Sequence, residues 1–136
     1  MSQENVELVR GLYEALARRD SVAPFEVYAE DIVWDVSQSR TAFLRTRPVS
    51  RGHAGVRQAW RDWFSAFSEI DAEVAELIDA GDQVVAVIRE RELGRASGVA
   101  VEATHAAVWT LAHSKVIRMQ MFDDREQALK AVGLEE

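Results

Sequence analysis

The chain has 136 residues (15.3 kDa), with 48% hydrophobic and 29% charged residues, a composition typical of one globular domain with its own core. Its formal net charge of −7 argues against nucleic-acid binding, because nucleic acids are bound through a basic surface. The absence of cysteine excludes disulfides and cysteine-ligated zinc, and no apolar run approaches the roughly 20 residues that a membrane span needs.

The first half of the chain predicts three helices and one strand. Apolar residues at helical spacing predict a helix over Gln3–Arg19, and a proline suited to a first turn predicts a short helix over Pro24–Ala29. Alternating apolar residues predict a strand over Asp31–Ser37. The polar, arginine-rich segment Gln38–Gly52 predicts a long loop, of the kind that often serves as a lid or a binding element. A broad apolar stripe then predicts a helix over Ala54–Phe67.

The second half predicts strands joined mostly by tight turns. They cover Ile70–Asp79, Val84–Leu93, Val99–Ala112 and Lys115–Phe122, and a short helix follows over Asp124–Val132. Helices that precede a run of strands predict an α+β domain. We expect a curved antiparallel (mixed) sheet wrapped around the N-terminal helices, with a cone-shaped pocket between them.

The last two strands predict which side chains face this pocket. Val99–Ala112 places His105 and Trp109 on one face. In Lys115–Phe122, Arg118 and Gln120 alternate with large apolar residues. Because buried polar groups without partners are costly, we expect these two side chains to line a half-polar cavity for a small molecule.

The opposite face of Lys115–Phe122 predicts an interface between two copies. It carries Ile117, Met119 and Met121, which would then lie on the convex side of the sheet. An apolar sheet face usually needs a partner, so we expect a homodimer packed through this face. The alternative is that this row is the inner face and that Arg118 faces solvent.

His105 is the best candidate proton carrier, because imidazole can act as general acid or base near neutral pH. The alternative is a core histidine hydrogen-bonded to backbone or to a carboxylate. The three histidines are scattered without a cluster of acidic partners, so we expect no metal and no other cofactor.

The other candidates for catalysis are Arg118, Gln120 and Asp35. Arg118 could stabilise an oxyanion and Gln120 could orient a ligand. The alternative is that Arg118 pairs with Glu90 or Glu92 across the sheet. Asp35 could act as a base if the strand register brings it inward, and otherwise it lies on the convex face.

Large aromatic side chains are the candidate walls of the cavity. They suit a flat or apolar ligand, although plain core packing explains each of them equally well on its own. The candidates are Trp34, Trp60, Phe64, Trp109 and Phe122, and we expect Tyr13 and Val36 to contact the ligand as well.

Two stretches carry a family resemblance. They are Arg51-Gly52-His53-Ala54-Gly55-Val56-Arg57, which opens the third helix, and the ending from Phe122-Asp123-Asp124-Arg125 through Gly133-Leu134. With the order of elements, they make the chain resemble the SnoaL-like branch of the nuclear-transport-factor-two-like superfamily over essentially its whole length, as one domain over 1–136. The resemblance implies the cone fold. The superfamily includes cyclases, isomerases, dehydratases, epoxide hydrolases and non-catalytic binding modules, so fold alone does not select among these functions.

The resemblance also implies positions for catalytic groups, and each known set is incomplete here. SnoaL-like cyclases use an aspartate and a histidine on the last strand, where this chain has Gln120 and Arg118. A glutamine cannot take up a proton. Ketosteroid isomerases place their base where this chain has Val36, with Asp35 one residue away, and Tyr13 is the possible analogue of their oxyanion-hole tyrosine. Epoxide hydrolases of this superfamily need an inward pair of aspartates around an arginine, which the sequence does not supply.

The sequence therefore predicts a cytoplasmic protein that binds a small apolar organic ligand and no membrane or nucleic acid. If it is an enzyme, we expect cofactor-independent proton transfer of the isomerase, cyclase, dehydratase or epoxide-hydrolase type, on an apolar substrate with a carbonyl-type oxygen. The alternative is a non-catalytic ligand-binding or accessory module, which the incomplete catalytic sets favour. A third hypothesis is a structural dimer whose cavity is filled by its own aromatic residues.

Overall fold

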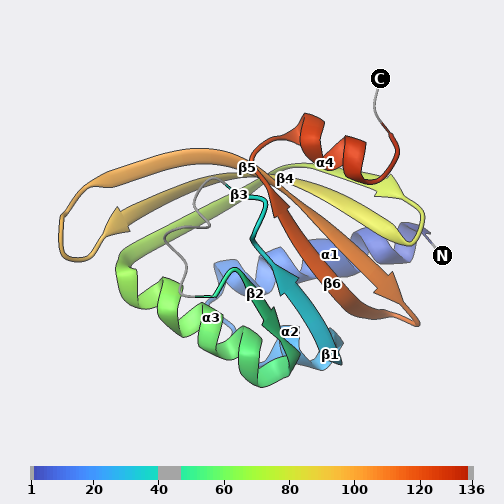
Figure 1. Ribbon diagram of the computed structural model, residues 1–136, viewed down its shortest axis with the longest axis horizontal. Coiled ribbons are helices and arrows are strands. Elements are labelled where there is room, and N and C mark those ends of the chain that lie inside the picture. The colour runs from blue at the N-terminus through green and yellow to red at the C-terminus, as the bar shows by residue number, and fades with distance from the viewer. Residues whose placement is uncertain (1, 40–46, 135–136) are drawn as a thin grey trace.

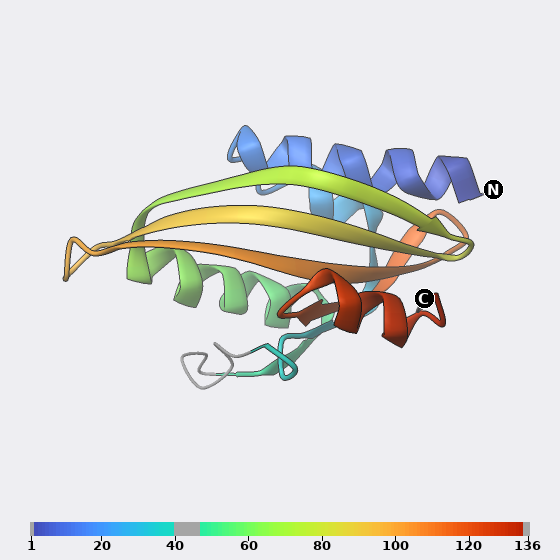
Figure 2. The ribbon, with the colours of Figure 1, turned by 90° about the horizontal axis from the view of Figure 1, so that it is seen from above.

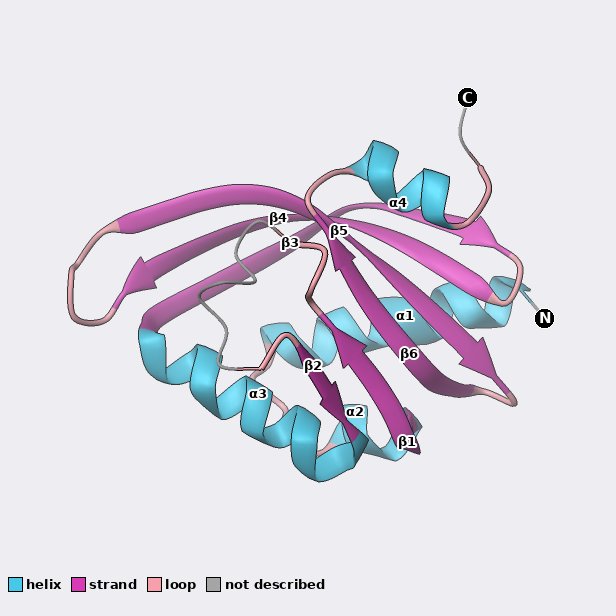
Figure 3. Cartoon of the chain, in the orientation of Figure 1, coloured by secondary structure: helices cyan, strands magenta, loops and turns pink. Residues whose placement is uncertain are grey.

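The computed structural model describes residues 2–39 and 47–134 and follows the predicted order of elements, with one additional short strand (Figures 1 and 3). The helices are α1 (Ser2–Ala17), α2 (Ala23–Val27), α3 (Gly52–Ala66) and α4 (Arg125–Ala131). The strands are β1 (Tyr28–Asp35), β2 (Val49–Arg51), β3 (Phe67–Ala80), β4 (Gln83–Gly94), β5 (Ala100–Ala112) and β6 (Lys115–Phe122).

The strands form a six-stranded mixed sheet in the order β2-β1-β6-β5-β4-β3 within the described residues. β1 lies parallel to β6, and the other neighbouring strands are antiparallel. The sheet curves around the N-terminal helices and is not closed (Figure 1). The prediction of an α+β domain with a curved, mixed sheet is confirmed.

The predicted loop over Gln38–Gly52 contains a strand that the sequence did not indicate. β2 pairs with β1, so that Val33 lies opposite Arg51. Gly52 then turns the chain into α3 with φ of 71°, a conformation that glycine adopts without the strain a Cβ would bring. Residues 40–46 of the predicted loop lie outside the described part of the chain.

A β-bulge in β6 decides which side chains face inward. Leu111 pairs with Val116, but its neighbour Thr110 pairs with Arg118, so Ile117 is an extra residue in β6. An extra residue reverses the alternation of side chains from that point on. Val116 therefore shares the inner face with Leu111, whereas Arg118 shares the outer face with Thr110.

The prediction that Arg118 and Gln120 face the hollow is therefore wrong, and the alternative orientation holds. The side chain of Arg118 is 47% exposed, whereas Met119, which pairs with Trp109, is 1% exposed. The row expected on the convex side points inward after the bulge, so Met119 and Met121 do not form the predicted dimer surface. The homodimer itself stays a prediction.

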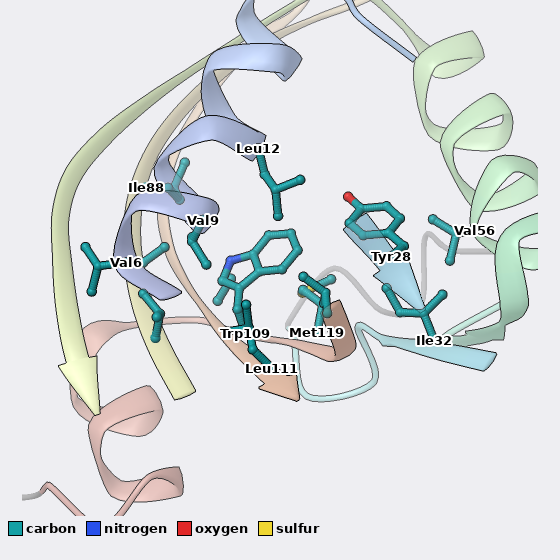
Figure 4. Packing of buried hydrophobic residues seen from close by; sticks show 14 of the residues in the cluster. Val6, Val9, Leu12, Tyr28, Ile32, Val56, Ile88, Trp109, Leu111 and Met119 are labelled. Carbon is teal, nitrogen blue, oxygen red and sulfur yellow. The ribbon is translucent and has the colours of Figure 1, made fainter. Parts of the chain in front are cut away.

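The inner face of the sheet packs against α1 and α3 around one core. Val6, Val9 and Leu12 of α1 meet Ile88, Trp109 and Leu111 of the sheet, with Val56 of α3 across the hollow (Figure 4). Val36 belongs to this core and is 2% exposed.

A second, smaller core lies on the outer face, where α4 covers the sheet. Figure 2 shows α1 and α4 on opposite sides of β3, β4 and β5. Phe122 packs there against Ala128 and Leu129 of α4, beside Val85 and Val108. The predicted role of Phe122 as a wall of the inner cavity is therefore wrong, because it follows the bulge on the same face as Arg118.

Among residues 2–39 and 47–134, every helix is too short or too polar to span a lipid bilayer.

Candidate functional site

A cavity of about 110 Å³ lies between the inner face of the sheet and helices α1, α2 and α3. All four tryptophans of the chain line it, namely Trp34, Trp60, Trp63 and Trp109. A cavity of this size holds several water molecules or a small organic ring. Of the aromatic walls predicted from the sequence, Trp34, Trp60, Phe64 and Trp109 lie in this lining, as does Tyr13.

The aromatic rings meet mainly edge to face and therefore hold one another in place. Trp34 lies 5.8 Å from Trp109 and 6.1 Å from Trp60, measured between ring centroids, at interplanar angles of 79° and 70°. Tyr28 instead stacks on Trp109 at 23°. Edge-to-face pairs are a preferred geometry of aromatic side chains, and walls of this kind suit a flat, apolar ligand.

His105 and Glu90 form a polar pair in the wall of this apolar cavity. Nδ1 of His105 lies 3.3 Å from Oε2 of Glu90, and the two side chains are 13% and 22% exposed. They stand on neighbouring strands, where His105 pairs with Ile88, two residues before Glu90. Because both line the cavity, a group that can transfer protons is brought to the place where a ligand would lie.

Sequence reasoning missed Glu90 as a site residue. The run Arg89-Glu90-Arg91-Glu92 resembles a strand leaving the core for solvent. In the structure its two glutamates lie on the inner face, in line with Val84, Ala86 and Ile88. The signal was present, because extending the period-two pattern of these buried residues leads to Glu90.

Glu92 follows on the same face and is only 6% exposed. The indole Nε1 of Trp63 donates a hydrogen bond to its Oε1 at 3.1 Å. This bond joins α3 to β4 and fixes one of the tryptophans of the cavity wall.

A second, more polar hollow of about 340 Å³ adjoins the aromatic cavity. Four residues line both spaces, namely Trp63, Glu90, His105 and Met121. The imidazole and the carboxylate therefore stand at the junction of an apolar chamber and a polar one. Such a position allows contact with a ligand on one side and proton exchange with solvent on the other.

Tyr13 is held in the cavity wall by Trp109, whose Nε1 donates a hydrogen bond to the tyrosine oxygen at 3.1 Å. Burial raises the pKa of Tyr13 well above its usual range; the Trp109 hydrogen bond opposes this and the charge of Glu90 adds to it. The phenol is therefore neutral at physiological pH.

Asp35 and Arg118 face one another on the outer side of the sheet, away from the cavity lining. The carboxylate Oδ2 lies 3.5 Å from Nη2 of Arg118, and its Oδ1 accepts a hydrogen bond from the backbone N–H of Ser37 at 2.9 Å. Burial raises the pKa of Asp35, but the hydrogen bonds from Ser37 and Arg118 outweigh burial and hold the pKa below its usual value. The structure thus offers no inward base at this position, because Asp35 pairs with Gln120 of β6 on the outer face. Arg118 does not pair with Glu90 or Glu92.

Of the predicted site residues, the structure brings His105 to the cavity. Four others do not line it, namely Val36, Phe122, Arg118 and Gln120. Among the residues that the structure describes, no group of three or more His, Asp or Glu side chains is placed to hold a metal ion.

Solved structures with the same fold extend over nearly the whole chain. An NTF2-like protein from Burkholderia pseudomallei K96243 has 20% identity and a TM-score of 0.80, covering 95% of this chain and 97% of its own. TerC, co-crystallised with polyporic acid, has 18% identity and a TM-score of 0.78, covering 96% and 98%. A candidate SnoaL-like polyketide cyclase from Jannaschia sp. CCS1 has 19% identity and a TM-score of 0.75, covering 98% and 94%.

No curated protein matches the sequence. The SnoaL-like domain family matches residues 9–119, which span α1 to the bulged strand β6 and include nearly every residue of the cavity wall. The chain belongs to the SnoaL-like domain family.

Proposed function

We propose that this protein binds a small, mostly apolar organic molecule in the aromatic cavity and catalyses cofactor-independent proton transfer on it. The observation that carries the proposal is the His105–Glu90 pair, 3.3 Å apart in the wall of an otherwise aromatic cavity. Titratable groups in an apolar pocket are typical of sites for general acid–base catalysis.

The geometry assigns different roles to the two side chains. When Nδ1 of His105 carries a proton facing Glu90, the other ring nitrogen, Nε2, keeps its lone pair and can accept a proton from the substrate. The carboxylate then stabilises the imidazolium that forms. His105 is the proton carrier in this scheme, and Glu90 positions it.

The apolar lining of the cavity supports an apolar substrate. On such a substrate, His105 would remove an acidic proton from a carbon beside a carbonyl to give an enolate. Return of the proton to another carbon gives isomerisation, attack of the enolate on a second carbonyl of the substrate gives cyclisation, and loss of a β-hydroxyl as water gives dehydration. TerC supports the view that a fold of this kind takes up an organic ligand, since it was co-crystallised with polyporic acid.

The test begins with a thermal-shift screen of ketones, epoxides and polycyclic aromatics, followed by product analysis of each compound that binds. For a converted compound, His105→Gln should lower kcat at least about 100-fold and leave the dissociation constant within about twofold. Glu90→Gln should lower kcat less, by about tenfold, because it acts through His105. His113→Gln is the matched control, since His113 is exposed in the β5–β6 turn, and its activity should be unchanged. Full activity in His105→Gln would contradict the assignment.

A non-catalytic ligand-binding module is the second candidate. The resemblance to SnoaL-like cyclases implies a base at the position of Gln120, and a glutamine cannot take up a proton; its side chain also lies on the outer face of β6. Saturable binding of compounds that are recovered unchanged after long incubation would favour this candidate over the enzyme.

A further inference from the structure

Tyr28 places a hydroxyl group inside the aromatic cavity. Its side chain extends from the start of β1 into the space between α1 and α3, with the oxygen pointing away from the strand (Figure 4). The residue is 3% exposed and belongs to the cavity lining. Its ring stacks on Trp109 and meets Phe25 edge to face at 5.2 Å, so the position of the hydroxyl is set by packing.

This hydroxyl has no hydrogen-bond partner among residues 3–39, 47–65 and 70–134. The contrast is Tyr13, whose oxygen accepts a hydrogen bond from Trp109. Burial, and to a smaller extent Tyr13, raises the pKa of Tyr28 well above its usual range, so the group is a neutral O–H donor. The hydroxyl lines the cavity and is not sealed off from it, so its donor is open to an acceptor supplied by whatever occupies the cavity.

The charges around the cavity restrict what this acceptor can be. Glu90 is acidic, and no arginine or lysine is among the described residues that line the space. The one lining group that can become a cation is His105, and it already lies 3.3 Å from Glu90. A ligand carboxylate or phosphate would therefore compete with Glu90 for His105 and would lie near another carboxylate. An uncharged oxygen with two lone pairs, as in a ketone or an aldehyde, meets no such penalty.

We infer that Tyr28 donates a hydrogen bond to an uncharged carbonyl-type oxygen of the ligand and is the residue that distinguishes carbonyl compounds from hydrocarbons of the same shape. This inference rests on the proposed binding of a small molecule in the cavity. It adds a recognition group on β1 to the cavity wall that His105 and Glu90 also line.

The test uses three flat probes of similar size: acetophenone, α-methylstyrene, which replaces the carbonyl oxygen by a methylene, and benzoate. Binding at pH 7 is measured from the indole N–H resonances of the ¹⁵N-labelled protein, because all four tryptophans line the cavity. Tyr28→Phe should raise the dissociation constant of acetophenone about fivefold and leave that of α-methylstyrene within about twofold of its value in the unmodified protein. Benzoate should bind the unmodified protein at least about tenfold more weakly than acetophenone.

The outcomes separate this inference from the proposed function. An equal effect of Tyr28→Phe on acetophenone and α-methylstyrene, or tighter binding of benzoate, would overturn the role of Tyr28 alone. If none of the three probes shifts any indole resonance at millimolar concentration, both proposals are overturned.

Thermal unfolding without ligand provides the control for folding. Tyr28→Phe removes only a hydroxyl that has no protein partner, so its thermal midpoint should equal or exceed that of the unmodified protein. Tyr13→Phe is the matched variant, and it should lower the midpoint because it removes the acceptor of Trp109. If Tyr28→Phe lowered the thermal midpoint as much as Tyr13→Phe does, the Tyr28 hydroxyl would have a structural role and the inference would be overturned.

Discussion

Asp35 and Glu90 are both carboxylates on strands, yet their surroundings give them different tasks. Asp35 accepts hydrogen bonds from the backbone and hydroxyl of Ser37 and faces Arg118, so its negative charge is stabilised on the outer face. Glu90 faces His105 within an aromatic wall. The first arrangement stabilises the end of β1, and the second brings a proton carrier to a cavity.

The pKa of Asp35 predicts a pH dependence of stability. Since hydrogen bonds hold the folded-state pKa below the unfolded value, the ionised carboxylate stabilises the folded protein above the unfolded pKa. This stabilisation is lost as the pH falls through the lower, folded-state value. Asp35→Asn should lower the free energy of unfolding by about 1 kcal/mol at pH 7, with the difference from the unmodified protein shrinking below about pH 4. Urea unfolding of both proteins across this pH range tests the prediction. A difference in the free energy of unfolding that grows toward acid pH would contradict it.

At the scale of elements, the bulge at Ile117 assigns the two faces of β6 to different cores. Residues before it and after it alternate normally, but the extra residue turns Met119 inward and Phe122 outward. One strand therefore contributes to the cavity wall through its methionines and to the docking of α4 through its terminal phenylalanine.

Two truncations on β6 should separate these contributions. Met119→Ala and Phe122→Ala each remove a large buried side chain and should lower the free energy of unfolding by about 2–5 kcal/mol. Only Met119→Ala should change the affinity for acetophenone, because Met119 lines the cavity and Phe122 lies under α4. A loss of probe binding in a folded Phe122→Ala variant would contradict this division of the strand.

At the scale of the whole molecule, the cavity wall joins segments that are far apart in the sequence. Leu12 of α1, Trp60 of α3 and Met119 of β6 all contribute to it. The proposed ligand would lie among these three segments, and the unfolded chain has no equivalent site. Ligand binding and global stability are therefore coupled.

This coupling predicts the size of a ligand's effect on unfolding. A ligand at 100 times its dissociation constant should stabilise the protein by about 2.7 kcal/mol. For a chain of this length, that corresponds to a rise of roughly 10 °C in thermal midpoint. Differential scanning calorimetry over a series of ligand concentrations tests it. A midpoint that does not depend on concentration would show that the ligand does not bind the folded protein in preference to the unfolded chain.

Several site residues were predictable because local spacing carries the information. The helical stripe containing Trp60 and Phe64 and the strand face containing His105 and Trp109 both reach the cavity. In these segments the regular periods of helix and strand continue without interruption, so the side of each residue follows from its neighbours.

What the sequence determined by itself is the α+β class, the order of the elements other than β2, and the apolar faces of helices and strands without a bulge, because these depend on periodicity and turn residues within short segments. Tertiary structure alone decided the parallel pairing of β1 with β6, the bulge at Ile117 and the meeting of Glu90 with His105. These depend on hydrogen bonding between strands distant in the chain. The alternation of side chains along one strand does not reveal an inserted residue. The bulge becomes evident only when the neighbouring strand defines the register.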